Sequence, residues 1–226
     1  MSAESSVASL VEFAEARTEP ASPEAEYARP AGRERVERTA HALRSHGIGA
    51  VVTAGRDAAR AAVLERLPPG SEVFDFTSKT LEALGITSDE LSARGYRVLR
   101  PSMIEAMKSG RPGEARRIGA APEYALGSVH AVTEQGQLVI ASASGSQLPA
   151  YAYGAGHVIW AVGTHKIVPD LEGALRRIER YAYPLEDARA RAAYGVPSAV
   201  NKLLIIGREA TPDRATVVFV PEAVGF

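Results

Sequence analysis

Short apolar runs alternate with amphipathic segments along most of this 226-residue chain. Residues 48–53 and 71–76 are apolar runs with the length and residue types of buried strands. Between them, residues 57–67 carry apolar positions at helical spacing and end at Pro68-Pro69-Gly70. This strand–helix–strand order predicts a parallel sheet with right-handed crossovers.

The same patterns continue through the rest of the chain. Further strands are predicted over residues 96–99, 129–133, 138–141, 157–162, 202–206 and 216–220. Helices are predicted over residues 32–45, 81–84, 87–94, 101–109 and 149–155, with a long helix starting at 169–171 and another over 185–193. With about seven strands interleaved with helices, the predicted fold is α/β: three layers, with a mostly parallel sheet flanked by helices.

The first thirty residues have a different composition from the rest. We predict a flexible N-terminal arm over residues 1–30 and a single α/β domain over residues 31–226. Within the arm, residues 10–17 have an amphipathic pattern with Ser9 as a cap, followed by a Pro-rich linker. Two interpretations stand: a frayed tail, or a helix that packs on a partner subunit. Homo-oligomerisation is therefore left open.

Composition narrows the classes of function. Hydrophobic residues at 46% and charged residues at 23% are typical of a soluble globular protein, and the net charge of −1 provides no field that attracts nucleic acid or an acidic membrane. The chain has no cysteine, which excludes a disulfide, a thiol nucleophile, thiolate-bound zinc and a cysteine-ligated iron–sulfur cluster. No signal-peptide pattern and no apolar run of about 20 residues is visible, so a cytoplasmic protein is expected.

No cofactor or metal site is predicted. The sequence contains neither GxGxxG nor a GxSxG nucleophile elbow. His130, His157 and His165 do not have the spacing of metal ligands. We interpret His130 and His157 as structural residues next to strands, and His165 as a weak candidate for acid–base chemistry.

The segment 127–166 is the most informative part of the chain for function. Two apolar strands in it are followed by loops of Gly, Ser and Thr, whose backbone N–H groups can point at one ligand. The loop residues Ser144, Gly145, Ser146 and Gln147 are the best candidates for ligand contact, because Gly145 allows close backbone approach and the polar side chains can donate to oxyanions. A plain polar loop is the alternative.

A second candidate site is the hydroxyl-rich turn Thr77-Ser78-Lys79-Thr80 between a predicted strand and a helix. Such a turn can hold a phosphate or a carboxylate. It can equally be a capping turn with a solvated lysine. The upstream glycines of a P-loop are missing.

Lys166 and Glu134 are the candidate catalytic residues. Lys166 is one of only four lysines and follows a Gly-Thr-His turn, so it is predicted to pair with a substrate phosphate or carboxylate, or with Glu134. Glu134 ends a predicted strand, where it can act as a nucleophile, a general base or a ligand-orienting carboxylate. The alternatives are a solvated lysine and an exposed glutamate in a turn.

The motifs GTHKIVPDLEGAL (163–175) and SAVNKLLII (198–206) resemble the LUD-domain family, in its lactate-utilisation protein C-like form. The resemblance implies the fold shared by sugar-phosphate isomerases and CoA transferases. It also implies that Lys166 belongs to the ligand site. Asn201 and Lys202 of the second motif are candidates for the same cleft, and the alternative is that they cap a loop. CoA transferases place a nucleophilic glutamate in a turn comparable to that of Glu134.

The resemblance therefore implies a protein of lactate utilisation that binds a small anionic metabolite, bearing a carboxylate, a phosphate or CoA, in a cleft at the strand ends. One alternative is an isomerase or acyl/CoA transferase that uses Glu134, with Lys166 neutralising negative charge. The other is a non-catalytic regulatory or assembly subunit of an iron–sulfur lactate oxidoreductase. Partner proteins of that system carry the iron–sulfur clusters, which this chain cannot bind through cysteine.

Overall fold

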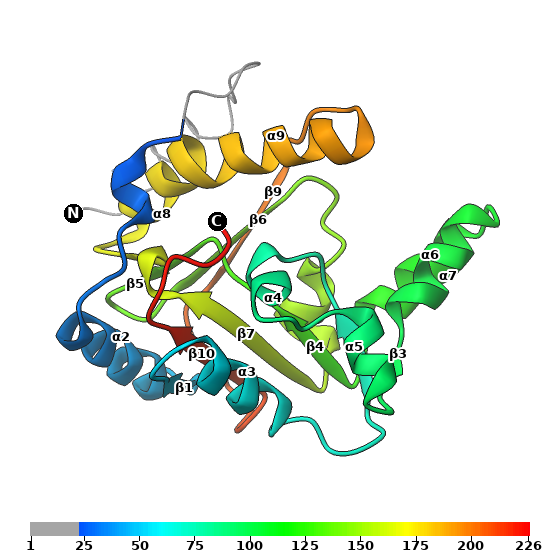
Figure 1. Cartoon of the computed structure of the whole chain (residues 1–226), viewed down its shortest axis with the longest axis horizontal. Coiled ribbons are helices and arrows are strands. Elements are labelled where there is room, and N and C mark those ends of the chain that lie inside the picture. The colour runs from blue at the N-terminus through cyan, green and yellow to red at the C-terminus, as the bar shows by residue number, and fades with distance from the viewer. Residues whose placement is uncertain (1–22) are drawn as a thin grey trace.

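Six parallel strands form the central sheet of the protein, for which a computed structural model describes residues 23–226. Figure 1 shows this sheet behind and between the helices. The strands lie in the order β1 (Gly49–Val52), β10 (Ala215–Val220), β7 (His157–Gly163), β4 (Tyr124–Gly127), β2 (Glu72–Asp75) and β3 (Arg97–Val98), and every neighbouring pair is parallel. The predicted α/β class with a mostly parallel sheet is confirmed.

Both faces of this sheet are buried, as the apolar strand sequences require. In β7, Val158, Trp160 and Val162 pack into one core, and Ile159 and Ala161 pack into the other. The helix α2 (Arg33–Ser45) covers the first face. The second face is covered by α3 (Arg56–Leu64), α4 (Lys79–Ala83) and α5 (Ser88–Ala93).

A second, four-stranded sheet was not predicted. It has the order β8 (Ile167–Val168), β5 (Ala131–Thr133), β6 (Leu138–Ser142) and β9 (Lys202–Ile206). The hairpin β5–β6 and the pair β6–β9 are antiparallel. Apolar runs reveal strands but not their partners, so the prediction of one sheet was wrong for these strands. Gly136, with φ of +83°, makes the tight turn that reverses the chain between β5 and β6.

A long helical rod lies over the second sheet. It consists of α8 (Leu171–Arg177), the π-helical turn η4 (Ile178–Ala182) and α9 (Tyr183–Tyr194), which follow one another without a break. Two separate helices were predicted here. In a regular α-helix, Pro184 lacks the N–H donor and its ring clashes with the carbonyl one turn back. The wider π-helical turn η4 lies directly before the helix that contains this proline.

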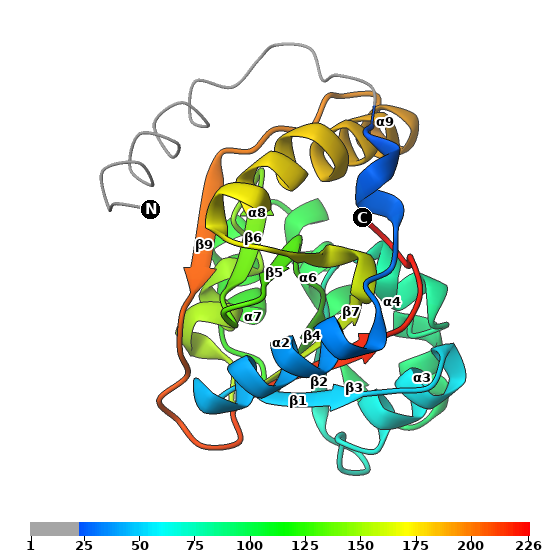
Figure 2. The ribbon, with the colours of Figure 1, turned by 90° about the vertical axis from the view of Figure 1, so that its left-hand side faces the viewer.

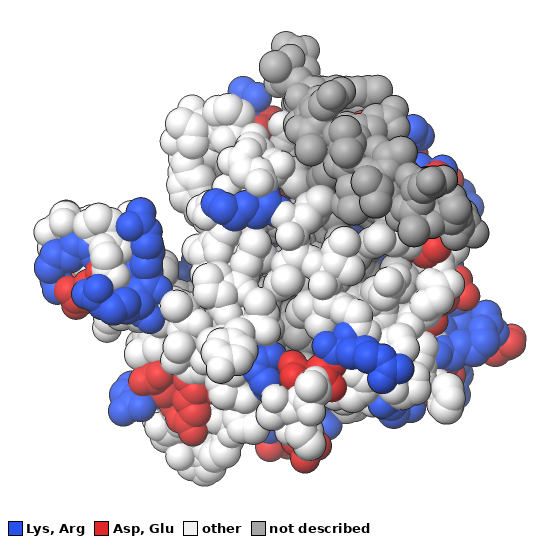
Figure 3. Space-filling model, turned by 180° about the vertical axis from the view of Figure 1, so that it is seen from behind, with Lys and Arg blue, Asp and Glu red and all other residues white. Residues whose placement is uncertain are grey.

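The helices α6 (Arg100–Lys108) and α7 (Pro112–Ala120) form a hairpin that projects from the body (Figures 1 and 3). The sequence pattern predicted the first of these helices, over residues 101–109, but not the second. Four basic side chains of this hairpin are exposed, namely Lys108, Arg111, Arg116 and Arg117, and Figure 3 shows basic side chains gathered on the projecting lobe.

The described end of the predicted N-terminal arm lies against the body. A 3-10 turn, η1 (Ala25–Ala28), is anchored by the Glu24 N–H, which donates to the Arg180 carbonyl at 3.0 Å. Figure 2 shows this segment running past the end of the helical rod toward α2. The predicted helix at 10–17 lies outside the described residues, and the domain boundary at residue 30 stays a prediction. No helix within residues 23–226 has the length and apolar character needed to cross a membrane.

Candidate functional site

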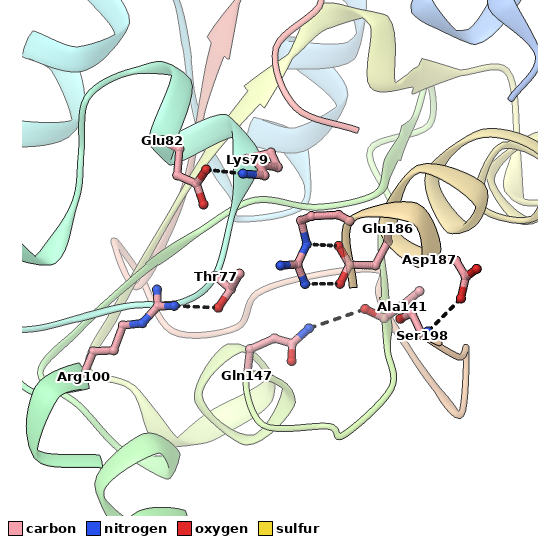
Figure 4. Close-up of polar contacts among 10 residues, drawn as sticks. Thr77, Lys79, Glu82, Arg100, Ala141, Gln147, Glu186, Asp187 and Ser198 are labelled. Atoms are coloured by element: carbon pink, nitrogen blue, oxygen red, sulfur yellow. Dashed lines mark hydrogen bonds and ion pairs between the residues drawn. The ribbon is translucent and has the colours of Figure 1, made fainter. Parts of the chain in front are cut away.

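A cavity of about 600 Å³ opens at the carboxyl ends of the neighbouring strands β7, β4 and β2. Ligands of α/β sheets bind at this edge, because the loops that leave the strands converge there. Its walls come from the turn after β2, the segment after β4, the loop after β6, α6, the helical rod and Phe226. Figure 4 shows side chains from four of these segments around a common space: Thr77 from the turn after β2, Arg100 from α6, Gln147 from the loop after β6 and Glu186 from the rod.

All four residues of the turn Thr77–Thr80 line this cavity. Ser78 also caps α4, since its Oγ accepts from the Leu81 N–H at 3.3 Å. Lys79 forms an ion pair with Glu82 at 2.5 Å. The structure therefore shows the predicted capping contact, and it also places the turn where a ligand can reach it.

The loop after β6 supplies a second wall, with Ser144, Ser146 and Gln147 among the lining residues. Its fold is held from inside by Ser142, whose Oγ accepts from the Gly145 N–H at 2.8 Å and contacts Gln147 Oε1 at 3.0 Å. Gly145 has φ of +84°, a left-handed conformation that favours glycine.

Asn201 and Lys202 hold this loop from the outside rather than lining the cavity. Asn201 Nδ2 donates to the Ala143 carbonyl at 3.1 Å, and Lys202 Nζ donates to the Ser144 carbonyl at 2.8 Å. A Cβ atom on Gly145 would lie 2.7 Å from the Lys202 side chain. The two residues are thus placed to position the loop.

Lys166 lies at the floor of the cavity and is 1% exposed. Its Nζ donates to Thr80 Oγ1, Ser128 Oγ and the Val129 carbonyl, each at 3.1 Å, and to the main-chain oxygen of Phe226, the last residue of the sequence, at 3.0 Å. Burial, followed by repulsion from Arg177, lowers the pKa of Lys166 well below its usual value. The four oxygen acceptors oppose that shift because they favour the ammonium form.

Arg177 is a second buried cation close to Lys166. Its guanidinium donates to the carbonyls of His130 and His165 and lies 5.0 Å from the ring centre of Tyr181. Burial lowers the pKa of Arg177 to about 10, and the Nη2 atom has no hydrogen-bond partner in residues 23–226. Within the same residues, no Asp or Glu side chain forms an ion pair with Arg177 or Lys166.

Three further cations stand around the cavity, and each has an acidic neighbour. Arg189 forms a two-pronged ion pair with Glu186, at 2.6 and 2.7 Å (Figure 4). Arg100 donates to Thr77 Oγ1 at 2.8 Å and lies 3.7 Å from Asp75. The third is Lys79. Arg100 and Arg189 were not among the predicted site residues, because both sit in helices whose charges resemble an ordinary solvated face.

His130 lines the cavity, although its sequence position indicated a structural role. Its Nδ1 accepts a hydrogen bond from the Ala141 N–H at 3.1 Å. Burial, then Lys166 and Arg177, lower the pKa of His130 to about 3. His165 is buried outside the lining, and burial followed by the same two cations lowers its pKa to about 2, so its ring is neutral.

Glu134 is not among the cavity-lining residues. Its carboxylate accepts from Arg35 Nε at 2.7 Å, and both side chains are about one-third exposed. The structure thus pairs Glu134 with a residue of α2 instead of Lys166. A catalytic role for Glu134 stays a prediction, without support from this arrangement.

Within residues 23–226, no three His, Asp or Glu side chains come together in a way that would hold a metal ion. The site is instead a polar, cation-rich cavity with aromatic walls, made by Phe74, Phe76, Tyr151 and Tyr183 among others. Such a site is suited to an anionic organic molecule.

The fold and this site define an α/β protein with a small-molecule cavity at its strand ends. The profile of the LUD domain matches residues 36–220, and the chain belongs to the LUD-domain family, which is associated with lactate utilisation. The chain is also similar to the crystal structure of a DUF162 family protein from Deinococcus radiodurans, with 15% identity and a TM-score of 0.51 over 84% of this chain and 99% of that one. At this identity the likeness supports the fold alone. A search of curated proteins found no match.

Proposed function

We propose that this LUD-domain protein binds a small anionic metabolite, bearing a carboxylate, a phosphate or CoA, in the cavity at the ends of β2, β4 and β7. The observation that carries the proposal is the buried pair of cations, Lys166 and Arg177, which has no Asp or Glu partner within the described residues. The three other cations of the cavity lining, Lys79, Arg100 and Arg189, each have an acidic neighbour, whereas Arg177 lies behind the lining.

Buried charge without a counter-charge is energetically costly. Removing an ion from water costs several kcal/mol even after the protein relaxes. An anion about 6 Å from one such cation gains roughly 3 kcal/mol at an effective dielectric constant of about 20. An anionic ligand above the cavity floor would therefore offset part of this cost.

Size and wall chemistry agree with this class of ligand. Small-molecule sites have volumes of roughly 300–1,000 Å³, and the cavity here has about 600 Å³. Its aromatic walls would cover the apolar part of a metabolite, while the serine and threonine hydroxyls of the two loops would donate to its oxygens.

The proposal assigns binding and not turnover to this chain. The isomerase or transferase hypothesis needs Glu134 at the reacting atoms, and Glu134 is held by Arg35 outside the lining. In lactate utilisation the chain would then supply a metabolite-binding subunit, and electron transfer would belong to iron–sulfur partner proteins.

The test is thermal stabilisation of the full chain by L-lactate, pyruvate, glucose 6-phosphate, AMP and acetyl-CoA. A ligand at about a hundredfold excess over its Kd adds roughly 2.7 kcal/mol of stability. We expect at least one of these anions to stabilise the wild type, and we expect Lys166→Met to reduce that stabilisation. Lys108→Met is the matched control, because Lys108 is an exposed lysine on the projecting hairpin.

Arg100→Ala is a second variant in case Lys166→Met does not fold. Arg100 is partly exposed on the cavity wall, so its loss should weaken binding of the anion without disturbing the packing of the core. The proposal fails if none of the five anions stabilises the wild type. It also fails if folded Lys166→Met and Arg100→Ala both respond as strongly as the wild type.

A further inference from the structure

The ring of His130 takes the place of a backbone partner in the second sheet. The His130 N–H donates to the Val139 carbonyl at 2.9 Å, which extends the β5–β6 ladder by one residue. Two residues further along β6, the Ala141 N–H donates not to a backbone carbonyl of the hairpin but to His130 Nδ1, at 3.1 Å. The carbonyl of His130 is in turn held by Arg177. Backbone contacts on both sides therefore fix the ring.

This contact determines which ring nitrogen carries the proton. A backbone N–H is always a donor, so Nδ1 of His130 must be the acceptor and cannot carry a proton. In the neutral ring the proton is then on Nε2. Within residues 23–226, Nε2 has no hydrogen-bond partner, and the ring lines the cavity.

The surroundings keep the ring neutral. Lys166 approaches from the turn after β7, and Arg177 approaches from α8. Both are cations, so a second proton on the ring would be repelled. No carboxylate pairs with the ring among the described residues, and the low pKa of about 3 agrees with this environment.

We propose that His130 is a ligand-recognition residue, which donates a hydrogen bond from Nε2 of its neutral ring to an oxygen atom of the anion in the cavity. The inference rests on the proposed function and adds to it a specific contact. It also adds a selection rule: the bound molecule presents a carbonyl, hydroxyl, carboxylate or phosphate oxygen at this point. A group that can only donate, or an apolar group, is disfavoured because it leaves the Nε2–H unpaired.

Two substitutions separate this role from a structural one. In His130→Asn, the side-chain oxygen can occupy the place of Nδ1 and keep the Ala141 contact, but the distal donor is lost. In His130→Gln, the side-chain NH₂ can occupy the place of Nε2 and keep the donor, but the Ala141 contact is lost. We expect His130→Asn to weaken binding of the anion about tenfold or more, with His130→Gln closer to the wild type.

The probes are pyruvate and inorganic phosphate, two oxyanions of different shape. Binding is measured by titration calorimetry, and thermal unfolding of each variant is measured alongside it. If the ring has only a structural role, His130→Gln should lose the most stability and His130→Asn should bind normally. That result would overturn the inference.

The tautomer is measured directly on the full chain labelled with ¹⁵N-histidine, with His130→Gln used to assign the signal. We expect an unprotonated Nδ1 and a protonated Nε2 at neutral pH, and we expect the His130 signals to shift on addition of the probe that stabilises the chain. The exposed His41 serves as the internal control. A protonated Nδ1 overturns the inference.

The outcomes distinguish the two proposals. Stabilisation by pyruvate or phosphate with unchanged His130 signals overturns the inference and leaves the proposed function in place. If no anion stabilises the chain, the proposed function fails, and the inference fails with it.

Discussion

Lys166 Nζ donates to Thr80 Oγ1 across 3.1 Å, joining two residues that are 86 positions apart in the sequence. Thr80 belongs to the turn after β2, and Lys166 belongs to the turn after β7. The hydroxyl of Thr80 donates onward to the Val224 carbonyl at 3.1 Å. One hydrogen-bond chain thus connects two strand ends and the segment that carries Phe226, and it forms the floor of the cavity.

Thr80→Val should destabilise the protein by about 1–3 kcal/mol. The substitution keeps the volume but removes both the acceptor for Lys166 and the donor to Val224 in a fully buried place. Urea unfolding measures the change. Thr80→Ser, which keeps the hydroxyl, is the control and should cost less. Equal losses in the two variants would mean that the methyl group, and not the hydroxyl, matters.

Acid should destabilise the fold well before its carboxylates titrate. The pKa values of His130 and His165 fall from 6.5 to about 3 and about 2 on folding, so below pH 6.5 the unfolded chain binds more protons than the folded one. Stability should be fully present above pH 6.5 and should fall as the pH drops toward 3, with a slope approaching about 1.4 kcal/mol per pH unit for each ring.

Urea unfolding between about pH 6.5 and 5 measures this slope, since ordinary carboxylates titrate lower. His130→Asn should reduce the slope by up to the contribution of one proton, because that variant lacks one of the two rings. Stability that does not change across this interval would show that neither ring is held neutral in the folded state.

Gly127→Ala should disturb the cavity wall through Tyr151. A Cβ on Gly127 would lie 1.7 Å from Tyr151 Oη, and the tyrosine lines the cavity. We expect a loss of about 1–3 kcal/mol, as is typical of overpacking. In the background of Tyr151→Phe, which lacks the clashing oxygen, the same substitution should cost less. A double-mutant cycle measures this coupling, and strict additivity would contradict it.

Arg214→Met should be among the most damaging single substitutions in this chain. Arg214 is 7% exposed and donates to the carbonyls of Ala150 and Ala155, which flank the π-helical turn η2 (Ala150–Gly154). It also pairs with Glu209 at 2.6 Å. Its removal leaves a largely buried carboxylate unpaired, for a cost of about 3–5 kcal/mol in urea unfolding. Arg38→Met is the control, because the Arg38–Glu34 pair is exposed and should contribute little.

Glu134→Gln tests the catalytic role predicted from the sequence. Because the carboxylate binds Arg35 and does not line the cavity, we expect the affinity for the stabilising anion to stay within about twofold of the wild type. Titration calorimetry with pyruvate or phosphate measures it. A large loss of affinity, or of any turnover found for the chain, would support the sequence-based assignment instead.

The sequence by itself determined the local structure and the class of fold. Apolar runs separated by capped helices predicted the parallel core strands β1, β2, β7 and β10, because burial on both faces requires apolar residues throughout a strand. A capping turn was one of the two interpretations of residues 77–80, and Ser78 does cap α4, a contact that a sequence can indicate because it joins residues only three positions apart. Lys166 and the turn 77–80 were each identified as candidates from composition and neighbouring residues.

Only the tertiary structure decided which of these candidates meet. Strand pairing joins residues far apart in the sequence, so the apolar run of β9 gave no sign that it pairs with β6 in a second sheet. Glu134 and Lys166 both follow strands, but those strands leave them on different sides, one beside Arg35 and the other on the cavity floor. The interpretation of His130 changed most. Its sequence position indicates a structural residue. In the structure its ring lines the cavity, and burial beside two cations together with the contact from Ala141 fixes its tautomer. Charge, burial and hydrogen bonding act through space, and the folded chain alone brings those groups together.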